Sequence, residues 1–217
     1  MTLVALSAAY GAAGSRVGPE LARRLGVPFV DRGIPLAVAE RLHVPVDEAV
    51  AHEDDTARPS LLERLIAGFA GGDNATVPVA PAPGSVTAED FNRASEAVIR
   101  ELAATGAGVI LGRGAVAVLR DDERVLRARL TGPAPRRVRQ AMSLGGAGEA
   151  TARATLRRLD QAQAEYLRRF YGVGIDDPAL YHLVLDATAF DVDALVEILV
   201  RGVRALAAGR MSGRTVG

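Results

Sequence analysis

The chain of 217 residues contains no cysteine, no tryptophan and no lysine. The lack of cysteine excludes disulfide bonds and thiolate metal sites. Aromatic residues make up only 4% of the sequence, so leucine, valine, isoleucine and alanine must build the core. Because lysine is absent, all 26 of the Lys-plus-Arg side chains are arginines, and any function that usually falls to a lysine is either missing or taken by an arginine.

Long hydrophobic runs are also missing. A membrane span needs about 20 mainly apolar residues, and the longest candidate, residues 192–208, is interrupted by Glu197, Arg201 and Arg204. The chain opens on a short apolar run without a basic region before it, which argues against a signal peptide. We therefore expect a cytoplasmic protein without a membrane partner.

The net charge is +0, but the basic residues are not evenly spread. Residues 113–169 contain 13 arginines and 6 acidic residues, a net charge of +7. A neutral protein with a basic middle third is a poor candidate for binding nucleic acid and a better one for binding a small phosphorylated ligand. A general arginine bias would explain the number of arginines, but it would not explain their clustering.

Short apolar runs alternate with helical patterns along the chain. Strands are expected near residues 2–7, 27–31, 108–112, 124–131 and 181–186. Helical patterns lie between them, the clearest near residues 87–104, from about residue 135, and near 151–171 and 191–208, and the tail after residue 208 looks frayed. This alternation predicts a mainly parallel sheet covered by helices on both faces, as one doubly wound domain over residues 1–217.

A glycine-rich turn follows the first predicted strand and opens a helix. A strand, such a turn and a helix start form an anion site, because backbone N–H groups converge on a phosphate there. The P-loop pattern G-x-x-x-x-G-K-[ST] is only partly met, since Arg16 and Val17 replace its second glycine and its lysine. Arg16 is the local substitute for that lysine, and Ser15 is the nearby hydroxyl for a metal ion. The alternative is a tight turn without a ligand. The turn consists of Gly11, Ala12, Ala13, Gly14, Ser15, Arg16, Val17 and Gly18.

A basic stripe is predicted on the long helix near residues 151–171. At 100° per residue, Arg153, Arg157, Asp160 and Arg168 fall within an arc of about 80°. From Arg157 to Arg168 the helix rises roughly 16 Å, enough to follow a polyphosphate chain. Guanidinium groups suit phosphate oxygens, and Asp160 would pair with an arginine and fix its orientation. A solvated helix face is the alternative interpretation.

Three stretches of the sequence, in order, resemble cytidylate kinase-like proteins. The first runs from Ser7 to Asp31 and includes S-A-A-Y-G-A-A-G-S-R-V-G-P-E-L and L-G-V-P-F-V-D. The second is the G-R-G segment around Arg113, in which Gly114 replaces the Asp of better-known cytidylate kinases. The third joins R-R-L-D at residues 157–160 and R-R-F-Y-G at 168–172 to D-P-A-L-Y-H-L-V-L-D-A-T at 177–188.

The resemblance implies a P-loop kinase-like three-layer α/β sandwich with a five-stranded sheet. It also implies a helical acceptor-binding insert (33–105) and an arginine-rich lid (142–176). Such a protein would transfer the γ-phosphoryl group of ATP, with Mg²⁺, to a small acceptor such as CMP. The alternatives are an inactive nucleotide-binding protein with a regulatory or scaffold role, and a kinase for a non-nucleotide metabolite. The apolar stretch 61–69 is either a dimer contact or internal packing.

The resemblance also assigns roles to individual residues. The residues Gly11 to Gly18 would hold the phosphates of ATP together with Arg153 and Arg157, and Ser15 would reach the metal ion. Catalytic roles would fall to Arg16, Arg157 and Arg168. The acceptor would be bound by Asp31, Arg113, Asp160 and Arg168.

Overall fold

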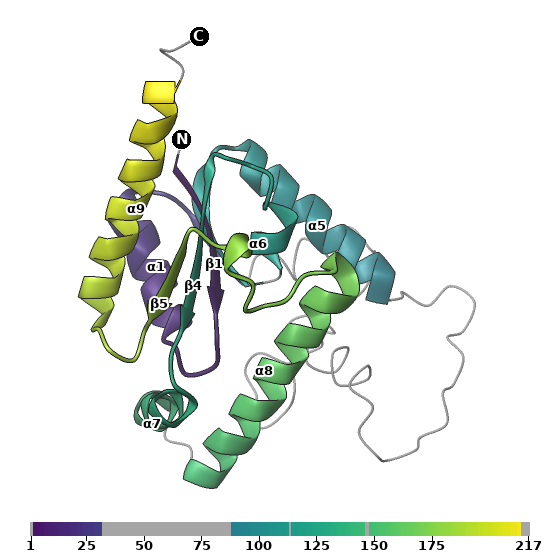
Figure 1. Ribbon diagram of the computed structural model, residues 1–217, viewed down its shortest axis with the longest axis vertical. Helices are drawn as coiled ribbons and strands as arrows, with labels where there is room; N and C mark the ends of the chain where they lie inside the picture. The colour runs from purple at the N-terminus through teal and green to yellow at the C-terminus, as the bar shows by residue number, and fades with distance from the viewer. Residues whose placement is uncertain (1, 32–87, 113, 146–147, 214–217) are drawn as a thin grey trace. The chain divides into compact units, whose positions relative to one another are not determined.

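Five strands form one parallel sheet, of which β1, β4 and β5 are labelled in Figure 1. The strands are β1 (Thr2–Ala8), β2 (Phe29–Val30), β3 (Ala107–Leu111), β4 (Val125–Thr131) and β5 (Leu183–Asp186). Their order across the sheet is β2-β3-β1-β4-β5, and each neighbouring pair is parallel. The predicted five-stranded α/β sheet is therefore confirmed, although β2 is shorter than expected.

The computed structural model describes residues 2–31, 88–112, 114–145 and 148–213. The chain divides into two compact units, one made of residues 1–31 with 99–217 and the other of residues 32–98. Most of the predicted acceptor-binding insert, the apolar stretch 61–69 and Arg113 lie outside the described residues.

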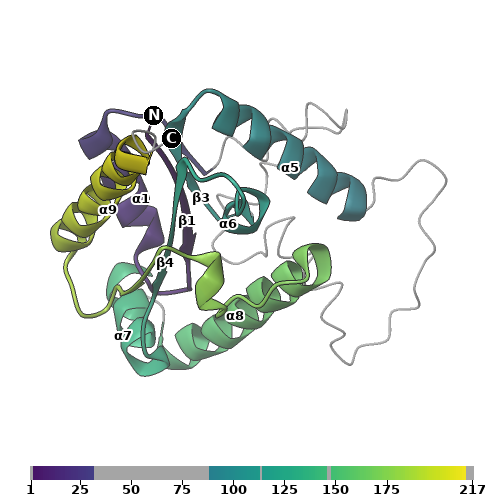
Figure 2. The same cartoon turned by 45° about the horizontal axis from the view of Figure 1, so that its top comes forward.

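Helices α1 (Gly14–Leu25) and α9 (Val192–Gly213) lie side by side and cover one face of the sheet (Figures 1 and 2). Val17 and Leu21 of α1 and Leu195 of α9 have no exposed surface, and they pack with alternate residues of β1 and β4. This is why the apolar residues of α1 recur every fourth position. Gly26 ends α1 in the left-handed conformation, which a glycine adopts without strain.

The end of α9 differs from the prediction. The sequence suggested a frayed tail after residue 208, but α9 continues to Gly213. Gly209 does not end the helix, since a glycine in a helix interior costs only about 1 kcal/mol.

Four more helical segments and one helical turn complete the described residues. They are α5 (Ala88–Ala104), α6 (Ala115–Val118), α7 (Ala134–Gly145), α8 (Glu149–Tyr171) and the 3₁₀ turn η1 (Pro178–Leu180). Helices α5, α7 and α8 match the predicted patterns. Helix α6 and η1 were not predicted, because four and three residues are too few to show a helical period. Helix α6 contacts β1, and α7 contacts α8.

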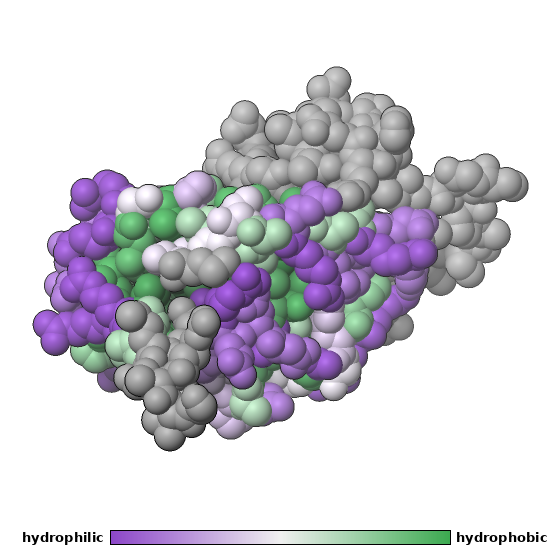
Figure 3. Space-filling view, turned by 90° about the horizontal axis from the view of Figure 1, so that it is seen from above, coloured by the Kyte–Doolittle hydropathy of each residue, from purple (hydrophilic) through white to green (hydrophobic). Residues whose placement is uncertain are grey.

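The surface of the described residues is mixed. In the view of Figure 3, hydrophilic side chains surround and separate the apolar areas. Among the residues that the structure describes, none of the helices is long and apolar enough to span a membrane.

His182 joins the start of β5 to β4. Its Nδ1 atom accepts a hydrogen bond from the backbone N–H of Arg127 at 3.1 Å, and the Arg127 side chain donates in turn to the carbonyl of Leu180. Burial lowers the pKa of His182 below its ordinary value, and the nearby charge of Arg127 lowers it further. The neutral imidazole is thus the form that the folded protein prefers.

We predict that His182 makes the fold less stable in acid. Because its pKa is lower in the folded state, the unfolded state binds the extra proton first, and stability falls as the pH drops below about 6.5. Melting temperatures of the wild type and His182→Asn between pH 5 and 8 measure this effect, since asparagine keeps an acceptor but does not titrate. The difference between the two curves should vary with pH over this range, and a constant difference would contradict the prediction.

Candidate functional site

In the part of the chain that the structure describes, several backbone donors of the turn between β1 and α1 have no acceptor. The N–H groups of Arg16 and Val17 donate to the carbonyl of Ala13, which starts the helix. Four other N–H groups of the turn find no acceptor among the residues that the structure describes. They belong to Gly11, Ala13, Gly14 and Ser15. Free N–H groups at a helix start, where the helix dipole is positive, form an anion site.

Two glycines of this turn are required by close packing. Gly11 has a positive φ of 75°, and a Cβ atom there would collide with the backbone carbonyl of Arg137. A Cβ atom on Gly14 would collide with the side chain of Ala8. The turn is therefore pressed between the end of β1 and the first turn of α7, which fixes its path.

Ala13 is the one non-glycine residue with positive φ among the described residues. Its φ of 55° and ψ of 23° lie in the left-handed region, which disfavours a residue with a Cβ atom. Such strain is commonly kept at ligand sites.

We predict that Ala13→Gly stabilises the protein by about 0.5–1 kcal/mol, because glycine removes the strain of the left-handed backbone. The matched control is Ala12→Gly, since Ala12 is fully buried and not left-handed. This control should destabilise the protein by roughly 1 kcal/mol through lost packing and added chain entropy. Urea unfolding measures both changes, and an Ala13→Gly variant that is less stable than the wild type would contradict the prediction.

Ser15 and Arg16 lie on the first turn of α1, and both are exposed. Neither side chain makes a hydrogen bond or ion pair with another described residue. The roles that the sequence suggests for Ser15 at a cation and for Arg16 at an anion stay predictions. In the described ranges no cluster of three or more His, Cys, Asp or Glu residues could hold a metal ion.

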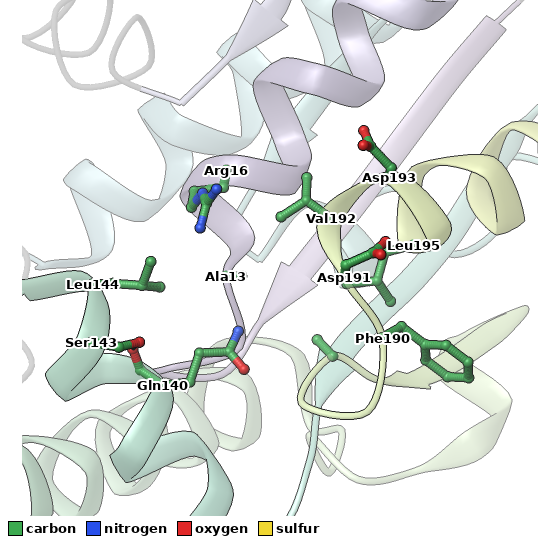
Figure 4. A pocket seen from close by; sticks show the side chains of 11 residues that line it. Ala13, Arg16, Gln140, Ser143, Leu144, Phe190, Asp191, Val192, Asp193 and Leu195 are labelled. Atoms are coloured by element: carbon green, nitrogen blue, oxygen red, sulfur yellow. The ribbon is translucent and has the colours of Figure 1, made fainter.

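A pocket of about 370 Å³ opens beside the turn, within the size range of small-molecule sites. Residues that line it are labelled in Figure 4: Ala13 and Arg16 belong to the turn and the start of α1, Gln140 and Leu144 to α7, and Phe190 to the segment before α9. Phe190 and Leu144 are 49% and 45% exposed, so both offer apolar surface to a ligand. Sequence reasoning missed this pocket. Its lining residues are Ala13, Arg16, Gln140, Ser143, Leu144, Ala187, Phe190, Asp191, Val192, Asp193 and Leu195.

Asp186 is the last residue of β5, and Ala187, which follows it, lines this pocket. The Oδ1 atom of Asp186 accepts hydrogen bonds from the backbone N–H and the hydroxyl of Thr188, at 2.9 and 2.6 Å. These hydrogen bonds hold the pKa of Asp186 below its ordinary value, with a smaller contribution from Arg136. Asp186 therefore shapes the loop that leads to Phe190.

The arginines of α8 fall into two groups. Arg153 forms an exposed ion pair with Glu149, one helical turn away, at 2.6 Å. Arg157 and Arg168 are also exposed, but neither makes a hydrogen bond or ion pair within the part of the chain that the structure describes. Arg157 and Arg168 are therefore available to a ligand, whereas the Arg153 side chain is engaged by Glu149.

Asp160 does not lie with the exposed arginines of its own helix. It shares the packed face of α8, where it pairs with Arg137 of α7 at 2.6 Å. The prediction that Asp160 pairs with an arginine agrees with the structure, but the partner was not foreseen. Arg137 lies in the first turn of α7, a place from which sequence alone gives no sign of this contact.

The segment after β3 turns on two left-handed glycines, Gly112 and Gly114. A Cβ atom on Gly114 would lie 2.9 Å from the ring of Tyr171 and 3.1 Å from that of Tyr166. The aromatic rings of α8 thus leave little room for a side chain at position 114. Asp31 follows β2 at the same end of the sheet, the carboxyl end, where open α/β sheets bind their ligands.

Comparison with known proteins places these features in a family. The chain matches the model of the cytidylate kinase-like family over residues 3–189. No curated protein matches it.

Solved structures share the fold at low sequence identity. An uncharacterized protein from Eubacterium ventriosum has a TM-score of 0.64 and 17% identity, over 94% of this chain and 99% of that chain. A gluconokinase from Sinorhizobium meliloti has a TM-score of 0.54 and 16% identity, over 98% and 97%. A shikimate kinase from Acinetobacter baumannii, in complex with shikimate, has a TM-score of 0.52 and 14% identity, over 94% of each chain.

These likenesses establish the fold, which is that of P-loop kinases. The family match extends from β1 to the segment before α9 and so includes the turn, the pocket's Ala187 and all of α8. The chain belongs to the cytidylate kinase-like family.

Proposed function

We propose that this protein is a phosphotransferase that moves the γ-phosphoryl group of ATP to a small acceptor, with CMP as the first candidate. The observation that carries the proposal is the turn after β1, where four N–H groups without an acceptor among the described residues lie next to a pocket of about 370 Å³. A phosphate chain on the turn would place its nucleoside in this pocket. Family membership supports a nucleotide as the ligand.

The pocket suits the donor base and ribose. Phe190 offers an exposed aromatic ring on which a base could stack. The opposite wall includes the aliphatic side chain of Leu144 and the amide of Gln140, which can donate and accept hydrogen bonds. Arg16 belongs to the turn and also lines this pocket, and in our proposal its guanidinium meets the phosphates.

Catalysis of phosphoryl transfer depends mainly on position and charge. An oxygen of the acceptor attacks the γ-phosphorus, a new P–O bond forms, and the bond to the β-phosphate oxygen breaks, so that ADP leaves with the electron pair. The free N–H groups of the turn would hold the β-phosphate. Arg157 and Arg168 would stabilise the negative charge of the transferring group, since no protein partner occupies them in the described part of the chain.

The metal requirement also fits the residues present. Mg²⁺ keeps several waters and takes further ligands from the substrate phosphates, so it needs few ligands from the protein. The exposed Ser15 hydroxyl supplies one such ligand in our proposal. When bound, Mg²⁺ would neutralise charge on the phosphates.

The acceptor side of the proposal rests on Asp31 and Arg113. Asp31 follows β2 at the carboxyl end of the sheet, and in the sequence Arg113 comes two positions after the end of β3. Asp31 would position the acceptor, and Arg113, which lies outside the described residues, would hold its phosphate.

A second function deserves a test. The chain has no lysine, and the usual P-loop lysine position is occupied by Val17, which is fully buried. A protein that binds nucleotides without transferring phosphate would show the same fold and the same free N–H groups. Such a protein would serve as a regulatory or scaffold component.

Thermal melting with Mg²⁺-ATP, with each common nucleoside monophosphate and with pairs of them tests the proposal. A ligand at 100 times its Kd should stabilise the fold by about 2.7 kcal/mol. ADP formation that depends on one monophosphate would identify a kinase and its acceptor. Stabilisation without turnover would favour the binding protein, and the absence of any shift would refute both.

A further inference from the structure

Arg137 joins three elements around the phosphate-binding turn. Its Nη1 atom donates to the carbonyl of Tyr10 in the turn at 3.0 Å, and its Nε atom donates to the carbonyl of Gly132, before α7, at 2.9 Å. Its Nη1 and Nη2 atoms also donate to the two carboxylate oxygens of Asp160 on α8, at 3.0 and 2.6 Å. Only 8% of the Arg137 side chain is exposed.

The hydrogen bond from Arg137 to the carbonyl of Tyr10 fixes the orientation of the peptide group between Tyr10 and Gly11. The carbonyl of Tyr10 and the N–H of Gly11 belong to the same planar trans peptide, so they point in opposite directions. When Arg137 holds the carbonyl, the N–H of Gly11 must point away from Arg137. This N–H is one of the four without an acceptor among the described residues.

The left-handed conformation of Gly11 gives this peptide freedom to rotate that other residues lack. Without a donor on its carbonyl, the peptide could turn over and present an oxygen to the phosphate instead of an N–H. A charged donor on the carbonyl also polarises the peptide, which strengthens its N–H as a donor.

Asp160 holds Arg137 in place and belongs to the helix that carries Arg157 and Arg168. A second contact of α8 reaches the same turn, since the amide of Gln163 donates to the carbonyl of Ala8 at 3.1 Å. The position of α8 is thereby coupled to the direction of the turn's donors.

We infer that Arg137 is a positioning residue that orients the Tyr10–Gly11 peptide for phosphate binding, and that Asp160 couples this orientation to helix α8. The inference rests on the proposed function, because it concerns the same phosphate site. It gives Asp160 a role in linking the turn to the predicted lid, and not a role in binding the acceptor.

The test compares binding of inorganic pyrophosphate with binding of adenosine. Pyrophosphate probes the turn alone, and adenosine probes the pocket alone. The variants are Arg137→Lys, which keeps the charge but loses the planar fork, and Asp160→Asn, which keeps the size but loses the charge. The controls are Arg201→Lys and Glu197→Gln, which make the same changes in an exposed ion pair on α9.

We expect the Kd of pyrophosphate to rise by about tenfold or more in both variants, as for the loss of one hydrogen bond to an anion. The Kd of adenosine should stay within about twofold, and both controls should match the wild type. In the free protein, the backbone amide resonance of Gly11 should shift in the two variants and not in the controls.

Other results would overturn the inference. If pyrophosphate binding is unchanged, the orientation of the peptide does not depend on Arg137. If pyrophosphate and adenosine weaken equally, the pair supports the fold and not the turn. If the wild type binds adenosine but not pyrophosphate, the phosphate site fails, and if it binds neither, the proposed function fails with it.

Discussion

Replacing Arg157 or Arg168 by alanine should lower turnover by about 10³-fold, the scale of the loss when a transition-state arginine is removed in phosphoryl transfer. Both side chains are exposed and make no hydrogen bond or ion pair within the described residues, so the fold should not depend on them. The melting temperature of each variant should therefore stay within about 2 °C of the wild type. Initial rates of ADP formation and a thermal melt of the same samples measure the two quantities.

The split between kcat and KM shows where these arginines act. If they stabilise the transferring group, kcat falls more than the KM for ATP changes. The control is Arg201→Ala, which removes an exposed arginine from α9, away from the turn and the pocket. Near-normal turnover in Arg157→Ala and Arg168→Ala would remove both residues from the mechanism.

Much of the fold could be predicted because it depends on local patterns. Local patterns in the sequence indicate which faces are buried. They are the apolar runs of β1 and β4 and the four-residue spacing in α1. The position of the phosphate turn also follows from local order, since a strand, glycines and a helix start are adjacent in the chain. Helix α6 and η1 were not predicted, because such segments are too short to show a helical period.

The contacts of the site could not be predicted, because they join residues that are far apart in the chain. Arg137 and Tyr10 are separated by 127 positions, and Gln163 and Ala8 by 155. No spacing rule reports such pairs. The pocket was missed for the same reason, since its walls come from α1, α7 and the segment before α9.

The excess of arginine in the middle third has a partly structural origin. Three of these arginines are buried, with 9% or less of their surface exposed, and they are Arg127, Arg129 and Arg137. Arg127 and Arg129 lie on β4, where a charged residue suggests an exposed position. The hydroxyl of Ser7 accepts a hydrogen bond from Arg129 at 3.2 Å. The interpretation of the cluster as a phosphate site thus applies to its exposed members.

Gly11→Ala should be the most damaging single substitution in the turn. Its left-handed φ of 75° costs an alanine about 1–2 kcal/mol, and the new Cβ atom would collide with the backbone carbonyl of Arg137. Since a backbone atom cannot move aside as a side chain does, we add about 1–3 kcal/mol for the overpacking. The free energy of unfolding should therefore fall by roughly 3 kcal/mol, measured by urea denaturation.

Gly26→Ala separates the two causes of this loss. Gly26 has a similar φ of 66°, but a Cβ atom there would meet no other atom within 4 Å. This variant should lose only the cost of the left-handed backbone, about 1 kcal/mol, and keep its affinity for pyrophosphate. Gly11→Ala should lose that affinity as well, because the collision displaces the Gly11 N–H and the carbonyl that Arg137 holds. If the two variants lose equal stability and bind pyrophosphate equally, the contact between the turn and α7 does not shape the phosphate site.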